Sequence, residues 1–518
     1  MVGSKNPKKV VMIVIDSLNP VVLESCFAKG LTPALQFFRD RGFYHRDCVS
    51  VFPTMTPSCT STIVTGTMPG QHQVPGFVWF NRREKRFINY GASLGAIWKI
   101  GLPRVIKDLL YNLNIEQLNR NIYTIYEILE EKGFTTASVN FYIFRGRNVF
   151  ETKIPWWIKL LTRSRLVGRL NGPQLLVIGD ICRPVRLFKK ANLGGPAGPF
   201  NKFGVNDEYS GLVAGWLIKE GQQPDLMMVY LPDNDGYSHR HHPLETEESL
   251  VRADQQIQRM LDAYPSWEAA LEETVFMVAG DHSQSLINSE QEAFIDLRSI
   301  LGKFRQAQLG KLIAINKEIA ICPNERMAHI YILKRLRRTE TFTDVLYLLG
   351  KDKRIDQIMW KEGRKGNFTY HVMYGNYAEL TFKRGGGYKD VYGASWTFSG
   401  DLKVIDASYI GDRILYGQYP DALNRIAGLL DARYAGDVVI TAKPGCEFAG
   451  EGTPLHPGCG SHGSLHRGDS CTPLLIAGSE RDIPNPRLLD FFPYILEHFG
   501  VELPRYLKSV EEPLNPFL

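Results

Sequence analysis

The chain has 518 residues, of which 44% are apolar and 22% are charged, and its formal net charge is +6. This composition is typical of a soluble globular protein, and the length allows one elaborated domain or two to three ordinary ones. No stretch approaches the roughly 18 consecutive apolar residues of a membrane-spanning helix, which excludes a helical membrane protein.

Strand-like and helix-like stretches alternate along most of the chain. The first strand, at 10–15, is too short for a signal-peptide core and leads into Asp16 without a cleavage site, so we expect a cytoplasmic protein. The eight cysteines form no CxxC pair, as is usual for reduced cysteines. The alternation favours a parallel, doubly wound α/β sheet. In chain order, we predict a helix at 32–41, a helix from about Thr56 to Thr65, a helix at 123–132, strands at 134–141 and 226–231, a helix at 245–263, and strands at 275–279, 438–441 and 474–477.

Two long regions, at about 80–205 and about 285–435, fit this alternation poorly. The second contains 370–382 and 403–410, which have the pattern of antiparallel strands. We interpret both regions as insertions that lie over the carboxyl edge of the sheet.

Acidic residues and histidines follow three of the predicted strands. Asp16 follows the first strand, Asp281 and His282 follow the strand at 275–279, and Asp235 and His239 are four residues apart, so that one helical turn puts both on one face. Each group alone is equally compatible with a solvated loop or a helix cap. Together, at the carboxyl edge of a parallel sheet, they favour a divalent metal site.

Thr56 lies in a hydroxyl-rich segment, TMTPSCTSTIVTG, that has the features of a helix N-terminus with Pro57 in its first turn. A helix N-terminus offers free N–H groups and a positive dipole end to a phosphate. A threonine hydroxyl is a weak nucleophile unless a metal ion or a base activates it. A metal ion held by Asp16 and Asp281 is able to do so.

Five motifs of this chain resemble those of the alkaline phosphatase superfamily, in particular its type I phosphodiesterase/nucleotide pyrophosphatase branch. In family order they are VIDSL, FPTMTPSCTSTIVTGTMPGQH, DGYSHRHHP, AGDHS and SHGSLHRGDSCTPLLIAG. The resemblance implies a three-layer αβα sandwich with a mostly parallel central sheet. It also implies a single catalytic domain over 1–518, with the regions 80–205 and 285–435 as caps over the active site.

The resemblance further implies two zinc ions, with manganese or another divalent cation as the alternative, and a nucleophilic threonine. The ligands of the first ion would be Asp16, Thr56, Asp281 and His282. The ligands of the second ion would be Asp235, His239 and His462. Thr56 would attack phosphorus in a phosphodiester or pyrophosphate, and water would then hydrolyse the phosphothreonine intermediate.

The register of the nucleophile rests on spacing, and one family residue is missing. Thr56, rather than Thr54, has the family's nine-residue spacing to Thr65. Many members carry a phosphate-binding asparagine where this chain has Phe77, and Asn81 is nearby but out of register. Phe77 and Asn81 are therefore the candidate substrate-binding positions.

Two other enzyme classes of this superfamily, the sulfatases and the cofactor-independent phosphomutases, do not fit the sequence. The segment CTSTI lacks the Pro and Arg of a sulfatase, and Thr56 replaces the serine of a cofactor-independent phosphomutase. A phosphonate or phosphomonoester hydrolase of the same fold and a non-catalytic phospho-ligand-binding relative remain as alternatives. The expected partner is a small-molecule phosphate ester or pyrophosphate, and no known motif supports specific nucleic-acid binding.

Residues 145–190 are strongly basic, with eleven Lys or Arg against two acids. We favour a cap helix with a solvated basic face. The alternatives are an interfacial helix at 155–170 that contacts an anionic membrane, and a basic lip over a polyanionic substrate.

Overall fold

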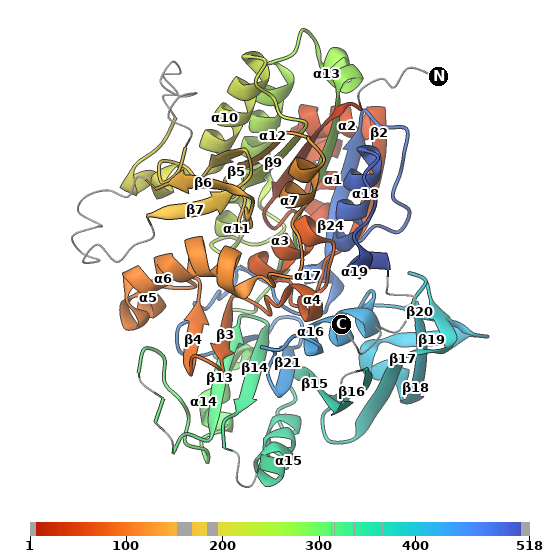
Figure 1. Cartoon of the computed structure of the whole chain (residues 1–518). Helices are drawn as coiled ribbons and strands as arrows, with labels where there is room; N and C mark the ends of the chain where they lie inside the picture. Colours follow the sequence, from red (N-terminus) through yellow and green to blue (C-terminus); the bar gives the residue numbers. More distant parts are fainter. Residues whose placement is uncertain are drawn as a thin grey trace.

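A computed structural model describes residues 7–508, except 153–167, 184–194, 312, 315, 335–337 and 365. The helix predicted at 155–170 thus lies almost entirely outside the described residues. The chain has a mixed α/β fold built on a seven-stranded central sheet (Figure 1). In spatial order the strands are β2 (Gly42–Val49), β24 (Cys471–Ala477), β10 (Thr274–Ala279), β1 (Lys9–Ile15), β9 (Leu226–Leu231), β5 (Thr136–Val139) and β8 (Leu175–Val177).

Parallel pairing dominates the central sheet. The neighbours from β10 through β1, β9 and β5 to β8 are all parallel, whereas β24 is antiparallel to both β10 and β2. Met12 of β1 lies opposite Met277 of β10 and Met228 of β9. This register brings the carboxyl ends of the three central strands to one edge of the sheet.

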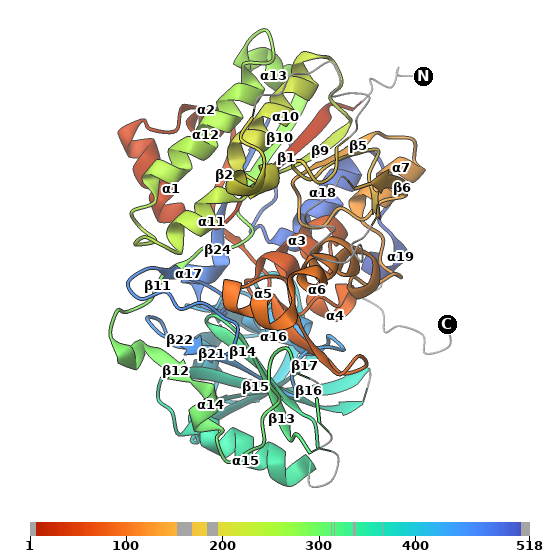
Figure 2. The same ribbon diagram turned by 90° about the vertical axis from the view of Figure 1, so that its left-hand side faces the viewer.

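Helices cover both faces of the central sheet (Figure 2). Val11, Ile13 and Ile15 of β1 pack into one buried cluster, and Val10, Met12 and Val14 pack into another on the opposite face. A strand buried on both faces is expected where a parallel sheet has helices on each side. The helices of the first cluster are α1 (Pro20–Lys29), α2 (Pro33–Arg41), α10 (Asp207–Lys219), α12 (Glu247–Leu261) and α13 (Trp267–Glu273). Those of the second are α3 (Thr56–Thr65), α7 (Ile125–Glu131) and α18 (Phe491–His498).

A second, nine-stranded sheet lies below the central sheet in both views (Figures 1 and 2). All its pairings are antiparallel except that of β17 with β20. Its strands are β13 (Ile319–Asn324), β14 (Met327–Ile332), β15 (Ile355–Arg364), β16 (Asn367–Tyr374), β17 (Ala378–Asp390), β18 (Ser395–Gly400), β19 (Ala407–Ile410), β20 (Arg413–Tyr416) and β21 (Val438–Ala442). Helices α15 (Arg338–Gly350) and α16 (Ala422–Leu430) accompany it.

The second sheet confirms some strand predictions and corrects others. The antiparallel pattern at 370–382 is confirmed, because β16 and β17 pair as a hairpin there. The prediction of 403–410 is half right, since 402–405 is a 3₁₀ turn and only 407–410 is a strand. The strand at 438–441 was expected in the central sheet, but β21 lies between β14 and β15 of the second sheet. An apolar pentapeptide specifies burial and not the identity of its partner strand, which explains this error.

The region 80–205 supplies β5 and β8 to the central sheet, besides elements that lie outside it. In chain order, the other elements in or next to this region are β3 (Val78–Asn81), β4 (Arg86–Asn89), α5 (Leu94–Ile100), α6 (Leu102–Lys107), the π-helix η1 (Asp108–Gln117), β6 (Asn148–Glu151), β7 (Arg169–Gly172) and the 3₁₀ helix η2 (Pro199–Gly204). The remaining short elements are α4 (Pro69–His72), α11 (Asp233–Ser238), β11 (Ser285–Leu286), η3 (Gln291–Ala293), β12 (Phe294–Asp296), α14 (Leu297–Ile300), η4 (Leu402–Ile405), β22 (Glu447–Ala449), β23 (Gly460–Ser461), α17 (Arg467–Ser470), η5 (Leu488–Asp490) and α19 (Arg505–Lys508). In the described part of the chain, none of the helices combines the length and apolarity needed to cross a bilayer.

Candidate metal centre

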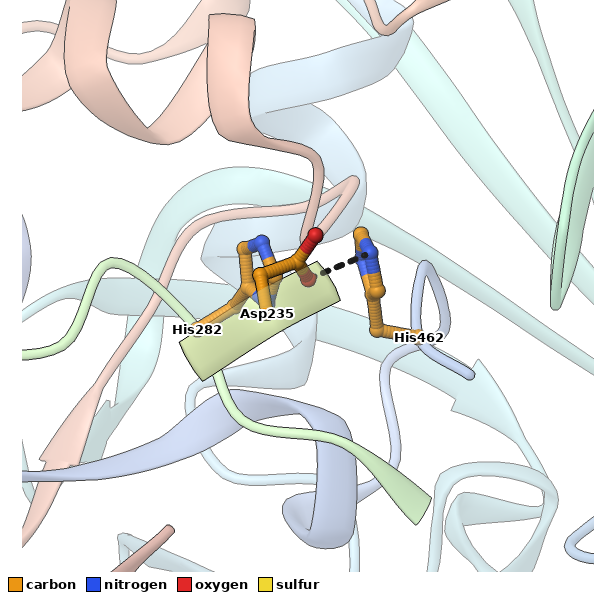
Figure 3. A group of neighbouring side chains, drawn as sticks. All are labelled: Asp235, His282 and His462. Atoms are coloured by element: carbon orange, nitrogen blue, oxygen red, sulfur yellow. Dashed lines mark ion pairs between the residues drawn. The ribbon is translucent and has the colours of Figure 1, made fainter. Parts of the chain in front are cut away.

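The seven predicted metal and nucleophile residues converge between the two sheets. Asp16 directly follows β1, Asp281 and His282 follow β10, and Asp235 lies on α11 just after β9. His462 follows β23 and reaches the same place from the other side (Figure 3). Ligand atoms lie within 4.8 Å of one another in two overlapping groups: Asp16 with Asp281 and His282, and Asp235 with His282 and His462.

The first cluster is arranged around the Nε2 atom of His282. This nitrogen lies 3.5 Å from Asp16 Oδ1, 3.7 Å from Asp281 Oδ2 and 3.3 Å from Thr56 Oγ1. The other ring nitrogen, Nδ1, lies 3.2 Å from the Ser283 carbonyl and 3.1 Å from Ser17 Oγ. With Nδ1–H donating to these oxygens, Nε2 presents its lone pair to the cluster, as in metal-ligating histidines.

A divalent cation fits this first cluster on two grounds. Asp16 Oδ1 is buried and accepts no hydrogen bond from the described residues, and a cation would satisfy this oxygen. Burial and the charges of Asp281 and Asp235 raise the pKa of Asp16 well above its usual value. Burial, together with Asp235, likewise raises the pKa of Asp281 to about 7. Crowded buried carboxylates of this kind are ionised readily only when a cation accompanies them.

The second cluster has the same histidine orientation. Asp235 Oδ1 lies 3.3 Å from His239 Nε2 and 3.6 Å from His462 Nε2. The Nδ1 atom of His239 is 2.9 Å from the Gly460 carbonyl, and that of His462 is 2.6 Å from the Thr54 carbonyl. The backbone N–H of His239 donates to the Asp235 carbonyl at 3.0 Å, so the predicted helical turn between the two residues is confirmed. Both Nε2 atoms therefore point at the same carboxylate.

Two neighbours that sequence reasoning missed hold the Asp235 carboxylate. Ser17 Oγ and Gln284 Nε2 each donate to Asp235 Oδ1 at 2.7 Å. Ser17 directly follows Asp16 and adopts a left-handed backbone with φ 59°, which turns its hydroxyl into the site. A serine after a strand-end aspartate is a weak signal by itself. Gln284 follows the Asp281–His282 pair by two residues and has no spacing that marks it.

Acidic and histidine side chains of the second cluster shift one another's pKa values. Although burial opposes ionisation, His239 and His462 lower the pKa of Asp235 well below its usual value. Burial alone would lower the pKa of His239, but Asp235 and Glu325 raise it to about 10. Glu325, which sequence reasoning also missed, has its pKa lowered to about 2 by His462 and His239 against the effect of burial. Burial lowers the pKa of His462, so the two carboxylates carry more charge than the histidines do, and the cluster favours a cation.

Helix α3 places Thr56 at its first residue, with Pro57 next to it. The helix ends at Gly66, whose φ is 65°, and a Cβ atom there would lie 2.8 Å from the Phe492 ring. Glycine is required there because the left-handed backbone and the close ring leave no room for a side chain. The predicted start and end of this helix are thereby confirmed.

Three neighbouring hydroxyls have different partners. Thr54 Oγ1 donates to the Ser464 carbonyl at 3.2 Å and accepts from the Gly463 N–H at 2.8 Å. Ser58 Oγ donates to the Val74 carbonyl at 3.0 Å. Of the three, Thr56 has the hydroxyl that faces His282, which agrees with the register derived from spacing.

The two candidate substrate-binding residues lie at the two ends of β3: Phe77 directly precedes the strand, and Asn81 is its last residue. Phe77 is half-buried, packs edge-on against Tyr90 at 5.9 Å, and donates its backbone N–H to Asn324 Oδ1 at 2.8 Å. Asn81 is buried, accepts from two backbone N–H groups of the β3–β4 turn, and donates to Glu84 at 2.8 Å. The amide of Asn81 is therefore engaged in shaping the turn, and contact of either residue with substrate stays a prediction.

Comparisons with known proteins agree on the fold. A family model for type I phosphodiesterase / nucleotide pyrophosphatase matches residues 10–465. Phosphonoacetate hydrolase from Sinorhizobium meliloti 1021, solved with phosphonoformate, aligns at 15% identity and a TM-score of 0.55, covering 95% of this chain and 96% of that one. Human ectonucleotide pyrophosphatase / phosphodiesterase 5 aligns at 12% identity with a TM-score of 0.55 and 96% coverage of both chains. An inactive murine form of the latter, solved with AMP, gives 11% identity, a TM-score of 0.54 and 96% coverage of both chains. No curated protein sequence matches this chain significantly.

Proposed function

Because the chain belongs to the type I phosphodiesterase/nucleotide pyrophosphatase family, we propose that it is a two-zinc hydrolase of phosphodiester or pyrophosphate bonds that uses Thr56 as its nucleophile. The observation that carries the proposal is the position of the Thr56 hydroxyl, 3.3 Å from His282 Nε2 and at the start of α3. The proposal includes the three-layer, alkaline phosphatase-like organisation in a single domain whose insertions cap the site.

The proposed ligands divide into two sets. Asp16, Asp281, His282 and Thr56 form the first set, and Asp235, His239 and His462 form the second. The common orientation of the three histidines, with Nδ1 on an oxygen and Nε2 toward a carboxylate, supports this division. Two divalent cations held in this way would favour the alkoxide form of Thr56 and stabilise the negative charge that develops on the phosphoryl group.

The proposed reaction has two steps, both at Thr56. Thr56 Oγ attacks phosphorus in line, forming a P–O bond as the bond to the leaving group breaks. Water then cleaves the phosphothreonine and restores the Thr56 hydroxyl. Ser17 and Gln284 would keep Asp235 in place throughout, because both donate to its Oδ1 atom. Burial of the whole of α3 supports the rigidity that in-line attack requires.

Metal analysis and a substrate panel test the proposal together. We expect about two zinc ions per chain and turnover of aryl phosphodiesters or dinucleotide pyrophosphates. Aryl phosphomonoesters, phosphonates and sulfates complete the panel. Active protein without a divalent metal would contradict the assignment.

Phosphonate hydrolysis is the second candidate. The same threonine and ligand sets would serve it, and a solved phosphonoacetate hydrolase shares the fold at a TM-score of 0.55. Turnover of phosphonates without turnover of diesters would favour this alternative. Stoichiometric zinc without turnover of any panel member would favour a phospho-ligand-binding protein.

A further inference from the structure

Glu325 reaches the second metal cluster from the cap region. It lies in the tight turn between β13 and β14, where its backbone has φ 56°. Two backbone hydrogen bonds hold this turn. The Arg326 N–H donates to the His462 carbonyl at 2.9 Å, and the N–H of Phe448 in β22 donates to the Glu325 carbonyl at 2.8 Å. The side chain is only 14% exposed. Glu325 is therefore held against the site as part of its wall.

The Glu325 carboxylate lies about as far from two histidines of the second cluster as the Asp235 carboxylate does. Glu325 Oε2 lies 3.5 Å from His462 Nε2, and Oε1 lies 3.8 Å from His239 Nε2. Asp235 Oδ1 lies at a similar 3.6 Å and 3.3 Å from the same two nitrogens. Ligands of a tetrahedral zinc ion bound at about 2.0–2.1 Å lie roughly 3.3–3.4 Å apart. The four carboxylate-to-imidazole distances thus lie between 3.3 and 3.8 Å, close to the spacing of zinc ligands.

We propose that Glu325 is a fourth protein ligand of the divalent cation that Asp235, His239 and His462 bind. This inference rests on the proposed function only for the presence of that cation. Catalytic zinc sites usually have three protein ligands and one open position, whereas sites with four protein ligands are closed. Here a residue of the cap insertion takes the fourth position, so a phosphoryl oxygen would reach this ion only as a fifth ligand, as in the five-coordinate transition states of some zinc enzymes.

Surrounding contacts orient the Glu325 carboxylate. Oε2 accepts from the His462 N–H at 3.1 Å and from Ser461 Oγ at 3.0 Å, and a carboxylate has enough lone pairs to bind a cation as well. Ser461 Oγ also lies 3.0 Å from Glu447 Oε2, and Glu447 lies 3.0 Å from His456 Nδ1. This network joins the Glu325 turn to the loop that carries His462.

His456 offers a competing arrangement, in which a separate ion is held by His239, Glu325 and His456. Their ligand atoms lie within 4.8 Å of one another. The ring of His456, however, stacks on that of His239, with centroids 4.3 Å apart and planes inclined by 28°. The Nε2 atom of His239 can bind only one ion, and it lies 3.3 Å from Asp235. Because His239 Nε2 is closer to Asp235 than to Glu325, at 3.3 Å against 3.8 Å, we assign His239 to the ion that Asp235 binds, with Glu325 as a further ligand of that ion.

The additional carboxylate changes the charge of the site. While the Thr56 hydroxyl is protonated, three ligand aspartates leave two divalent cations with a net charge of +1, and Glu325 reduces it to zero. A neutral centre attracts a doubly charged phosphomonoester less strongly than a positive one does. Glu325 is thus expected to favour singly charged phosphodiesters over monoesters.

Metal affinity tests the proposal directly. Glu325→Ala and Glu325→Gln are compared with wild type and with Glu290→Gln, an exposed glutamate of the same insertion. Zinc content after dialysis and competition with a chromophoric chelator report the affinity of each site. We expect one of two zinc ions to bind at least ~10-fold more weakly in both Glu325 variants, and no change in Glu290→Gln. The ratio of diester to monoester kcat/KM should fall in Glu325→Gln.

Several outcomes would overturn the inference. Folded Glu325→Ala that binds two zinc ions as tightly as wild type would do so, as would a zinc-loaded crystal structure without a Glu325 oxygen within about 2.2 Å of the ion. A third wild-type zinc ion that disappears in both Glu325→Ala and His456→Ala would show a separate site instead. If Glu325→Ala does not fold, the zinc affinity of Glu325→Gln and the zinc-loaded crystal structure test the proposal in its place. If wild type binds zinc but hydrolyses nothing in the panel, the proposed function fails while the ligand assignment stands.

Discussion

Replacing Thr56 by alanine removes the one hydroxyl of its segment that faces His282. The three remaining first-set residues, Asp16, Asp281 and His282, still offer ligand atoms within 4.8 Å of one another, so we expect zinc content to stay at about two per chain. Turnover would then need water to replace a positioned nucleophile. Effective molarities for positioned groups reach 10⁵–10⁸ M, so a fall in kcat of at least ~10³-fold, roughly 4 kcal/mol, is a conservative expectation.

Thr54→Ala is the matched control, because it deletes a hydroxyl two residues away. Thr54 Oγ1 accepts from the Gly463 N–H at 2.8 Å, so its removal leaves a buried donor unpaired and should lower the free energy of unfolding by about 1–3 kcal/mol. We expect kcat to change far less than in Thr56→Ala. The assays are steady-state kinetics, metal analysis and mapping of the phosphopeptide after trapping a slow substrate. Full activity of Thr56→Ala, or phosphate on Thr54 or Ser58, would refute the reasoning.

Three further predictions concern the second metal, pH and lipid. The double variant Asp235→Ala/His239→Ala should lose one zinc ion by elemental analysis and keep its circular dichroism spectrum; retention of both ions would contradict the ligand assignment. Burial raises the pKa of Asp421 from the usual value of about 3.9 to about 6, so at a pH between these values the folded protein keeps a proton that the unfolded chain has released. The Asp421 contribution to the free energy of unfolding should therefore fall as pH rises from about 4 to 6, and denaturant titrations should show a flatter pH dependence in Asp421→Asn. If residues 155–170 contact anionic lipid, the protein should sediment with anionic vesicles and detach at high salt, and equal recovery in the supernatant with and without vesicles would count against that contact.

Local sequence determined the parts of the site that follow from strand ends and helical turns. Asp16 and Asp281 were located because each follows an apolar run that forms a buried strand, and parallel neighbours end at the same edge. Asp235 and His239 were placed together because one helical turn separates them. These relations depend on nearest neighbours along the chain, so a single sequence contains them.

Tertiary structure alone decided two other meetings of distant segments. The pairing of β21 with β14 and β15, rather than with the central sheet, depends on competition between partners of similar apolarity. Glu325 reaches the cluster because the β13–β14 turn packs against the His462 loop, more than 130 residues away along the chain. No periodicity or spacing near Glu325 encodes that contact. It arises because the inserted sheet folds with its β13–β14 turn beside the His462 loop, which is a property of the whole chain.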